Sequence, residues 1–110
     1  MRLIQAISAV ELAALLSESQ GADIQLVDVR DQWELELCVL PNVITIPMQL
    51  IPSRMKELST EVQIICICHH GMRSFQVAQF LVQNGFDRVI NLEGGMDSWA
   101  RTVDQNVALY

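Results

Sequence analysis

Residues 63–81, QIICICHHGMRSFQVAQFL, contain the clearest structural signal in this 110-residue chain. The segment from Gln63 to Ile67 is almost wholly apolar, which is typical of a central β-strand covered on both faces. Ser74 to Asn84 is predicted to be a helix, because apolar residues recur there at helical spacing and Gly85 follows as a C-terminal stop. A short polar loop led by Cys68 separates the two elements. This order favours an α/β domain with parallel strands.

The rest of the chain alternates between short apolar and polar blocks, as expected for strands joined by helices. Two predicted helices begin with the spacing of a capping box, Ser8 with Glu11 and Asp31 with Glu34, and Gly21 is expected to end the first of them. Such connections imply right-handed crossovers and a mostly parallel sheet. The apolar face expected for the first helix consists of Val10, Ala13, Leu15 and Leu16. Further strands are expected at 3–6, 24–29, 43–46 and 88–91, and further helices at 31–37, 53–58 and 96–103.

Cys68 is the candidate reactive residue, because open α/β folds bind their ligands at the carboxyl ends of the strands. A tight loop bends successive N–H groups toward one centre, and the start of the next helix adds about half a positive charge there. A free thiol titrates near ~8.5, and nearby donors stabilise the reactive thiolate. The sequence therefore predicts a thiolate or a persulfide anion inside a cup of N–H groups. The residues expected to form this cup are His69, His70, Gly71, Met72, Arg73 and Ser74.

The loop from Cys68 to Ser74 resembles the active-site loop of rhodanese-like domains, whose pattern is Cys-x-x-Gly-x-Arg-Ser before a helix. The resemblance implies an α/β, rhodanese-like three-layer fold, with a five-stranded, mostly parallel sheet flanked by helices on both faces, and one domain over residues 1–110. A departure occurs at 38–43 (CVLPNV), where many members have Gly-His-Ile-Pro-Gly-Ala, and it affects a structural turn rather than the chemistry. The other segments that resemble family signatures are 26–30 (LVDVR) with Trp33 and Glu34, 43–47 (VITIP) and 91–99 (NLEGGMDSW).

The same resemblance implies a sulfurtransferase that works through a persulfide on Cys68 and needs no cofactor. Cys68 would take the outer sulfur of thiosulfate or of a protein persulfide donor. It would pass that sulfur to a thiol, to cyanide in an assay, or to a protein acceptor. Arg73 would order the loop and receive an anionic donor. Asp28 and Arg30 match family residues near the active-site entrance, and we expect them to have a supporting role rather than to transfer protons.

The nearest chemical alternatives are a cysteine phosphatase and an arsenate reductase. Phosphatase loops have the spacing Cys-x5-Arg, whereas Cys68 and Arg73 are separated by four residues. The shorter loop has one N–H group fewer and suits a single sulfur atom better than a tetrahedral phosphate. Sulfur transfer is therefore favoured over both alternatives.

A third alternative belongs to a different class: a sulfur carrier or regulatory module that keeps the fold without turnover. Rhodanese-like domains that act in this way lack the cysteine, and Cys68 is present here. Slow release of one bound sulfur per chain would identify a carrier.

A metal site could in principle be formed by Cys66, Cys68, His69 and His70, whose side chains suit zinc or copper. The chain lacks the common Cys-x-x-Cys spacing, and adjacent histidines tend to diverge, so no metal is expected. Cys66 is interpreted as a buried strand thiol. Cys38 and Cys66 are also the candidates for a resolving thiol that pairs with Cys68.

The charge balance limits the possible partners. Seven basic and thirteen acidic residues give a formal net charge of -6, which disfavours nucleic acid and an anionic membrane surface as partners.

The composition also limits the class of protein and its location. The hydrophobic fraction of 51% excludes disorder. No apolar run approaches the ~20 residues of a membrane span, and Glu11 interrupts the apolar N-terminal segment, which we assign to the fold. Three cysteines, an odd number, favour a reduced, cytoplasmic location.

Overall fold

Five parallel strands form the centre of the protein in a computed structural model that describes residues 4–19 and 23–110. Their order across the sheet is β1-β5-β4-β2-β3, so β4 lies in the middle. All neighbouring pairs are parallel, which confirms the sheet expected from the sequence. The strands are β1 (Gln5–Ile7), β2 (Ile24–Asp28), β3 (Val43–Thr45), β4 (Gln63–Ile67) and β5 (Val89–Leu92).

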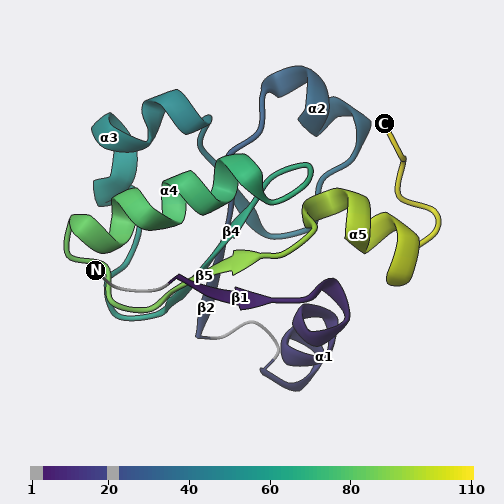
Figure 1. The fold of residues 1–110 in the computed structure, drawn as a ribbon, viewed down its shortest axis with the longest axis horizontal. Coiled ribbons are helices and arrows are strands. Elements are labelled where there is room, and N and C mark those ends of the chain that lie inside the picture. The colour runs from purple at the N-terminus through teal and green to yellow at the C-terminus, as the bar shows by residue number, and fades with distance from the viewer. Residues whose placement is uncertain (1–3, 20–22) are drawn as a thin grey trace.

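Helices cover both faces of the sheet, and Figure 1 shows α4 on one side of the strands and α1 on the other. Successive residues of a strand point to opposite faces, so the apolar β4 supplies two cores. Ile64 and Cys66 pack with α3 and α4, whereas Ile65 and Ile67 pack with α1 and α5. In the part of the chain that is described, no helix has the length and apolar content to cross a lipid bilayer. The helices are α1 (Ala9–Ser19), α2 (Gln32–Leu37), α3 (Ile51–Arg54), α4 (Met72–Gln83) and α5 (Gly95–Thr102).

Helix α1 begins as its capping box predicts. The Ser8 amide donates to Glu11 Oε1 at 2.9 Å, and the Glu11 amide donates to Ser8 Oγ at 3.1 Å. The predicted apolar face was partly wrong, because Val10 is 57% exposed whereas Leu12 is buried. Apolar residues occur on more than one side of this helix, and packing on the sheet selects the buried side. Gly21, the expected end of the helix, lies outside the described residues.

Helix α4 starts at Met72, two residues before the predicted start at Ser74. Gly71 precedes it with a φ of 94°, a left-handed conformation that glycine adopts without strain. A Cβ at this glycine would lie 3.2 Å from backbone atoms of β5 and of the turn that follows. Arg73 therefore belongs to the first turn of the helix, and the loop after β4 shortens to residues 68–71.

Other predicted boundaries shift by one or two residues, as expected when packing and local caps compete at element ends. The helix predicted at 53–58 was wrong in form: short 3₁₀ turns at Met48–Leu50 and Met55–Glu57 flank the four-residue α3. Pro52 lies in the first turn of α3, where a proline removes no helical hydrogen bond.

The turn at 38–43, where the sequence departs from the family pattern, keeps a left-handed residue. Asn42 has a φ of 61° and stands where the family pattern has its second glycine. Asparagine tolerates this conformation better than most residues with a side chain. The substitution therefore preserves a turn that leads into β3.

Candidate active site

The sulfur of Cys68 lies where the central strand ends, and it accepts hydrogen bonds from the turn that follows. The Gly71 amide lies 3.1 Å from Sγ and the Ser74 amide lies 3.3 Å from it. Amide donors at these distances stabilise negative charge on sulfur. Fewer N–H groups converge on the sulfur than the sequence predicts. Among the six described residues 69–74, two donate their amides to Sγ, namely Gly71 and Ser74. Residues 72–74 are already helical, so the turn around the sulfur is short.

The Cys68 side chain is enclosed, with 1% of the residue exposed. At the outer end of the turn, His70 and Met72 are exposed and Arg73 is half-buried. A donor therefore reaches the sulfur only after side chains at the rim move apart. The enclosure also strengthens the amide hydrogen bonds, because little water competes for the sulfur.

Asn91 of β5 organises the donors around the sulfur. Its Nδ2 donates to the Gly71 carbonyl at 3.0 Å, which leaves Oδ1 to accept the Ser74 hydroxyl at 2.5 Å. Ser74 Oγ also lies 3.3 Å from Cys68 Sγ. A serine has a single hydroxyl hydrogen, so Ser74 can donate fully to one of these two acceptors at a time, Asn91 Oδ1 or Cys68 Sγ. The sequence did not identify this residue, although a polar side chain within the buried strand β5 is the signal that marks it.

For the persulfide chemistry that the resemblance implies, an Asn91→Asp substitution is expected to slow sulfur loading of Cys68 by about 10- to 100-fold. The carboxylate cannot donate to the Gly71 carbonyl and places negative charge beside an anionic sulfur. Single-turnover mass spectrometry after thiosulfate addition measures the rate. Asn84→Asp is the matched control, because Asn84 Nδ2 also donates to a backbone carbonyl, that of Phe80, at the exposed end of α4. Equal loading rates in both variants would contradict the role of Asn91.

Arg73 joins helix α4 to helix α2 through Glu34. Both terminal guanidinium nitrogens donate to the Glu34 carboxylate, each at 2.7 Å. The side chain of Glu34 is 3% exposed and that of Arg73 is 34% exposed. The hydrogen bonds from Arg73 hold the pKa of Glu34 at about 2, well below its ordinary value, even though burial acts in the opposite direction. The guanidinium is therefore engaged by Glu34 rather than free to receive an anionic donor.

The lowered pKa of Glu34 predicts acid sensitivity. Its pKa is 4.5 ordinarily and about 2 in the folded protein, so the unfolded chain takes up the proton first as pH falls. The stabilisation of the fold by the ionised Glu34 carboxylate is complete above about pH 5 and is lost as pH falls from about 4.5 to 2. The groups facing the carboxylate, Arg73 and the Tyr110 hydroxyl, keep their protons throughout this range. Melting temperatures of Glu34→Gln measured across this range should fall less steeply than those of the wild type, and equal slopes would refute the assignment.

Asp28 and Arg30 form a buried ion pair behind the site, with Arg30 Nη2 2.8 Å from Asp28 Oδ2. Arg30 Nη1 donates to the Tyr110 hydroxyl at 2.8 Å, and that hydroxyl donates to Glu34 Oε1 at 2.9 Å. Burial alone lowers the pKa of Arg30, but its bonds to Asp28 and Tyr110 outweigh this and raise it. A hydrogen-bonded chain thus leads from Asp28 to Glu34, so the expected supporting pair reaches the active-site loop indirectly and not through contact with Cys68.

Tyr110 covers the face of His69 and was not identified from the sequence. The two rings stack with centroids 3.8 Å apart and 9° between their planes, while His70 lies 3.9 Å away from His69. Trp33 is largely exposed and meets Tyr110 edge to face at 5.7 Å. Burial raises the pKa of Tyr110 to about 12, and burial followed by the nearby His70 lowers that of His69. No local pattern marks Tyr110, because its partners are distant in sequence.

The start of helix α5 packs against the active-site loop and donates hydrogen bonds to its backbone carbonyls. The Met96 amide donates to the Cys68 carbonyl at 2.9 Å, and the Asp97 amide donates to the His69 carbonyl at 3.0 Å. Gly95 makes this approach possible, because a Cβ there would overlap with both carbonyl oxygens. The loop is therefore held in place by α5 as well as by α4.

The other two cysteines differ in environment, and all three thiols are free. Cys66 is fully buried in β4, and this burial raises the pKa of its thiol to about 12, which disfavours the reactive thiolate. Cys38 is half-buried, with Arg30 Nη1 3.6 Å from its Sγ. Their expected role as resolving thiols stays a prediction.

A single thiol held by amide hydrogen bonds at the carboxyl end of a central parallel strand defines a cysteine-centred α/β protein with an anion-stabilising turn. The chain belongs to the rhodanese-like domain family, whose sequence profile matches residues 8–102. This confirms the family indicated by the loop from Cys68 to Ser74.

Similar proteins support the same assignment. A sulfurtransferase of Allochromatium vinosum is 35% identical over 99 residues, which cover 90% of this chain and 91% of that protein. The crystal structure of a rhodanese-like domain protein from Staphylococcus aureus has a TM-score of 0.83 at 33% identity, over 97% of this chain and 99% of that chain. A NAD-dependent persulfide reductase from A. fulgidus has a TM-score of 0.70 at 32% identity and covers 87% of this chain, but only 16% of the reductase is matched. A relative of similar length is thus named for the transfer of sulfur groups.

Proposed function

We propose that this protein is a sulfurtransferase that carries a sulfane sulfur as a persulfide on Cys68. The observation that carries the proposal is the pair of amide hydrogen bonds from Gly71 and Ser74 to Sγ, at 3.1 and 3.3 Å. A persulfide differs from a thiolate by one added sulfur and keeps the same single negative charge. The same donors can therefore stabilise the sulfur before and after loading.

With thiosulfate as donor, the Cys68 thiolate attacks the outer sulfur. A new S–S bond forms on Cys68, the S–S bond of thiosulfate breaks, and sulfite leaves with the bonding electrons. The acceptor, a thiolate or cyanide, then attacks the terminal sulfur of the persulfide, and the Cys68 thiolate is released. No step changes the total charge or requires a cofactor, and Cys68 acts as a covalent nucleophile throughout.

The charge of the chain and the burial of the sulfur favour a protein persulfide over free thiosulfate as the physiological donor. The formal net charge of -6 repels a small dianion from most of the surface. In addition, the enclosed sulfur requires rim side chains to move, which contacts with a protein partner can drive. A rate with thiosulfate that does not change with salt concentration would count against the electrostatic part of this argument.

The phosphatase alternative is weakened by the position of Arg73. In a phosphate-binding loop the arginine faces the anion, whereas here both terminal nitrogens bind Glu34. The decisive comparison is to incubate the protein separately with thiosulfate and with a phosphate ester. We expect the intact mass to increase by about 32 Da with thiosulfate and to return after cyanide, with no phosphate released from the ester. Phosphate release without mass gain would refute sulfur transfer.

The carrier alternative shares the persulfide and differs in the rate of release. A carrier would gain one sulfur per chain and transfer it slowly to small thiols, whereas an enzyme would continue through many cycles. Thiocyanate formed per protein molecule under excess thiosulfate and cyanide distinguishes the two. We expect many turnovers, because the amide hydrogen bonds from Gly71 and Ser74 stabilise the Cys68 thiolate that is released at the end of each cycle.

A further inference from the structure

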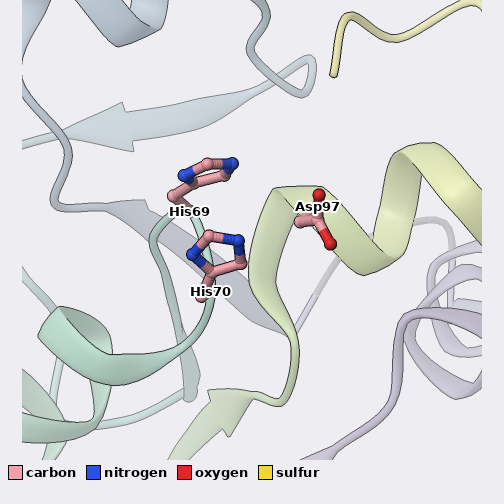
Figure 2. Close-up of side chains that lie close together, drawn as sticks. All are labelled: His69, His70 and Asp97. Atoms are coloured by element: carbon pink, nitrogen blue, oxygen red, sulfur yellow. The ribbon is translucent and has the colours of Figure 1, made fainter. Parts of the chain in front are cut away.

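A cluster of potential metal ligands lies beside the active-site turn, outside the sulfur chemistry. It contains His69 and His70 from the loop after β4 and Asp97 from the first turn of α5, which Figure 2 shows side by side. One ligand atom from each residue lies within 4.8 Å of the other two. The backbone fixes this arrangement, because the Asp97 amide donates to the His69 carbonyl at 3.0 Å.

His69 supplies the strongest independent indication of a ligand. Its Nε2 is buried, and among residues 4–19 and 23–110 it has no hydrogen-bond partner. Its ring cannot easily turn away, since it stacks between His70 and Tyr110 with centroid distances of 3.9 and 3.8 Å. Buried polar atoms without a partner are rare, and each one points to a function or a missing ligand.

Asp97 supplies negative charge at the open side of the cluster. Its Oδ2 pairs with Arg101 Nε at 3.0 Å, and in the described part of the chain Oδ1 has no hydrogen-bond partner, so Oδ1 is available to a cation. The net charge of -6 over the chain also attracts cations. Two imidazoles with one carboxylate form a donor set that binds Zn²⁺ and its neighbours in the first transition series.

We propose that His69, His70 and Asp97 form a binding site for a divalent transition-metal ion, with Zn²⁺ as the favoured occupant and water as the fourth ligand. Zn–N and Zn–O bonds are about 2.0–2.2 Å long, so ligand atoms around a tetrahedral ion lie about 3.3–3.6 Å apart. The candidate ligand atoms lie within 4.8 Å of one another. They must therefore approach one another by up to about 1.5 Å when the ion binds. The exposed His70 side chain supplies this movement, while His69 stays stacked on Tyr110.

The bound ion would connect the active-site loop to α5 and hold both imidazoles in place. Sequence spacing argued against a metal because it grouped the histidines with Cys66 and Cys68. The third ligand of the proposed site is instead Asp97, which is far from the histidines in sequence and is brought to them by the fold. The site does not depend on sulfur transfer.

The chain has two histidines, so imidazole NMR signals report on this cluster alone. Zn²⁺ is titrated into untagged protein carrying Cys68→Ser, so that the reactive thiol cannot compete for the ion. We expect both sets of imidazole signals to shift together and to saturate at one ion per chain. Loss of a ligand should weaken binding at least about tenfold, since even residues outside the first coordination shell contribute 10–100-fold, and we expect this for Asp97→Asn.

Glu57→Gln is the matched control, because Glu57 is, like Asp97, a carboxylate paired with an arginine, here Arg54 Nε at 2.9 Å. It should bind Zn²⁺ as tightly as the parent protein. Circular dichroism establishes that each variant is folded. Unchanged imidazole signals, a shift of only one ring, or equal affinity in the Asp97→Asn and Glu57→Gln variants would overturn the proposal. None of these results bears on persulfide formation, which is measured separately by mass.

Discussion

A Cys68→Ser variant is expected to gain no mass with thiosulfate, whereas the wild type gains about 32 Da for one sulfur. A serine hydroxyl stays protonated near neutral pH and cannot form a persulfide. The fold should be unaffected, because the smaller oxygen can accept the same amide hydrogen bonds from Gly71 and Ser74. Thiocyanate formation should fall to the uncatalysed background.

The other cysteines provide the controls for this experiment. Cys38→Ser should load sulfur like the wild type, since the proposed transfer needs one thiol. Cys66 is not expected to take up sulfur, because burial raises the pKa of its thiol to about 12. A mass gain of one sulfur in Cys68→Ser would place the persulfide on another residue, and the proposed function would then fail.

An Arg73→Ala variant is expected to lose about 2 kcal/mol of unfolding free energy, between the values for exposed and for fully buried ion pairs. The loss is large because Glu34 stays behind as a charge whose side chain is 3% exposed. Sulfur loading should also slow by about tenfold or more, since Arg73 precedes Ser74, whose amide donates to the sulfur. The protein should remain folded, because domains of this size have about 5–15 kcal/mol of stability. Urea unfolding and loading rates measure the two effects.

Substitution of the partner residue, Glu34, tests whether the unpaired carboxylate causes the loss of stability in Arg73→Ala. Glu34→Gln leaves Arg73 with a third of its side chain in water, so its loss of unfolding free energy should be smaller than that of Arg73→Ala. The double variant should be more stable than Arg73→Ala alone, because the unpaired carboxylate is removed. Losses that simply add would show that the ion pair does not account for the stability of this region.

Local signals in the sequence predicted much of the fold. The apolar run from Gln63 to Ile67 became the central strand with the predicted bounds, and the Ser8–Glu11 capping box formed at the start of α1. Both are short-range patterns, in which the residues that interact are neighbours in the chain. The register of an amphipathic face is less local, and the placement of Val10 in the core was accordingly wrong.

The sequence by itself therefore determined the alternation of strands and helices and placed Cys68 at the end of a central strand. Those features depend on hydrophobic periodicity and on backbone capping within a few residues. The tertiary structure alone decided what surrounds that sulfur: Asn91 as an organiser of donors, Glu34 as the partner of Arg73, and Tyr110 stacked on His69. Each of these contacts joins segments distant in sequence, and a linear pattern has no information about which distant side chains a parallel sheet brings to one edge.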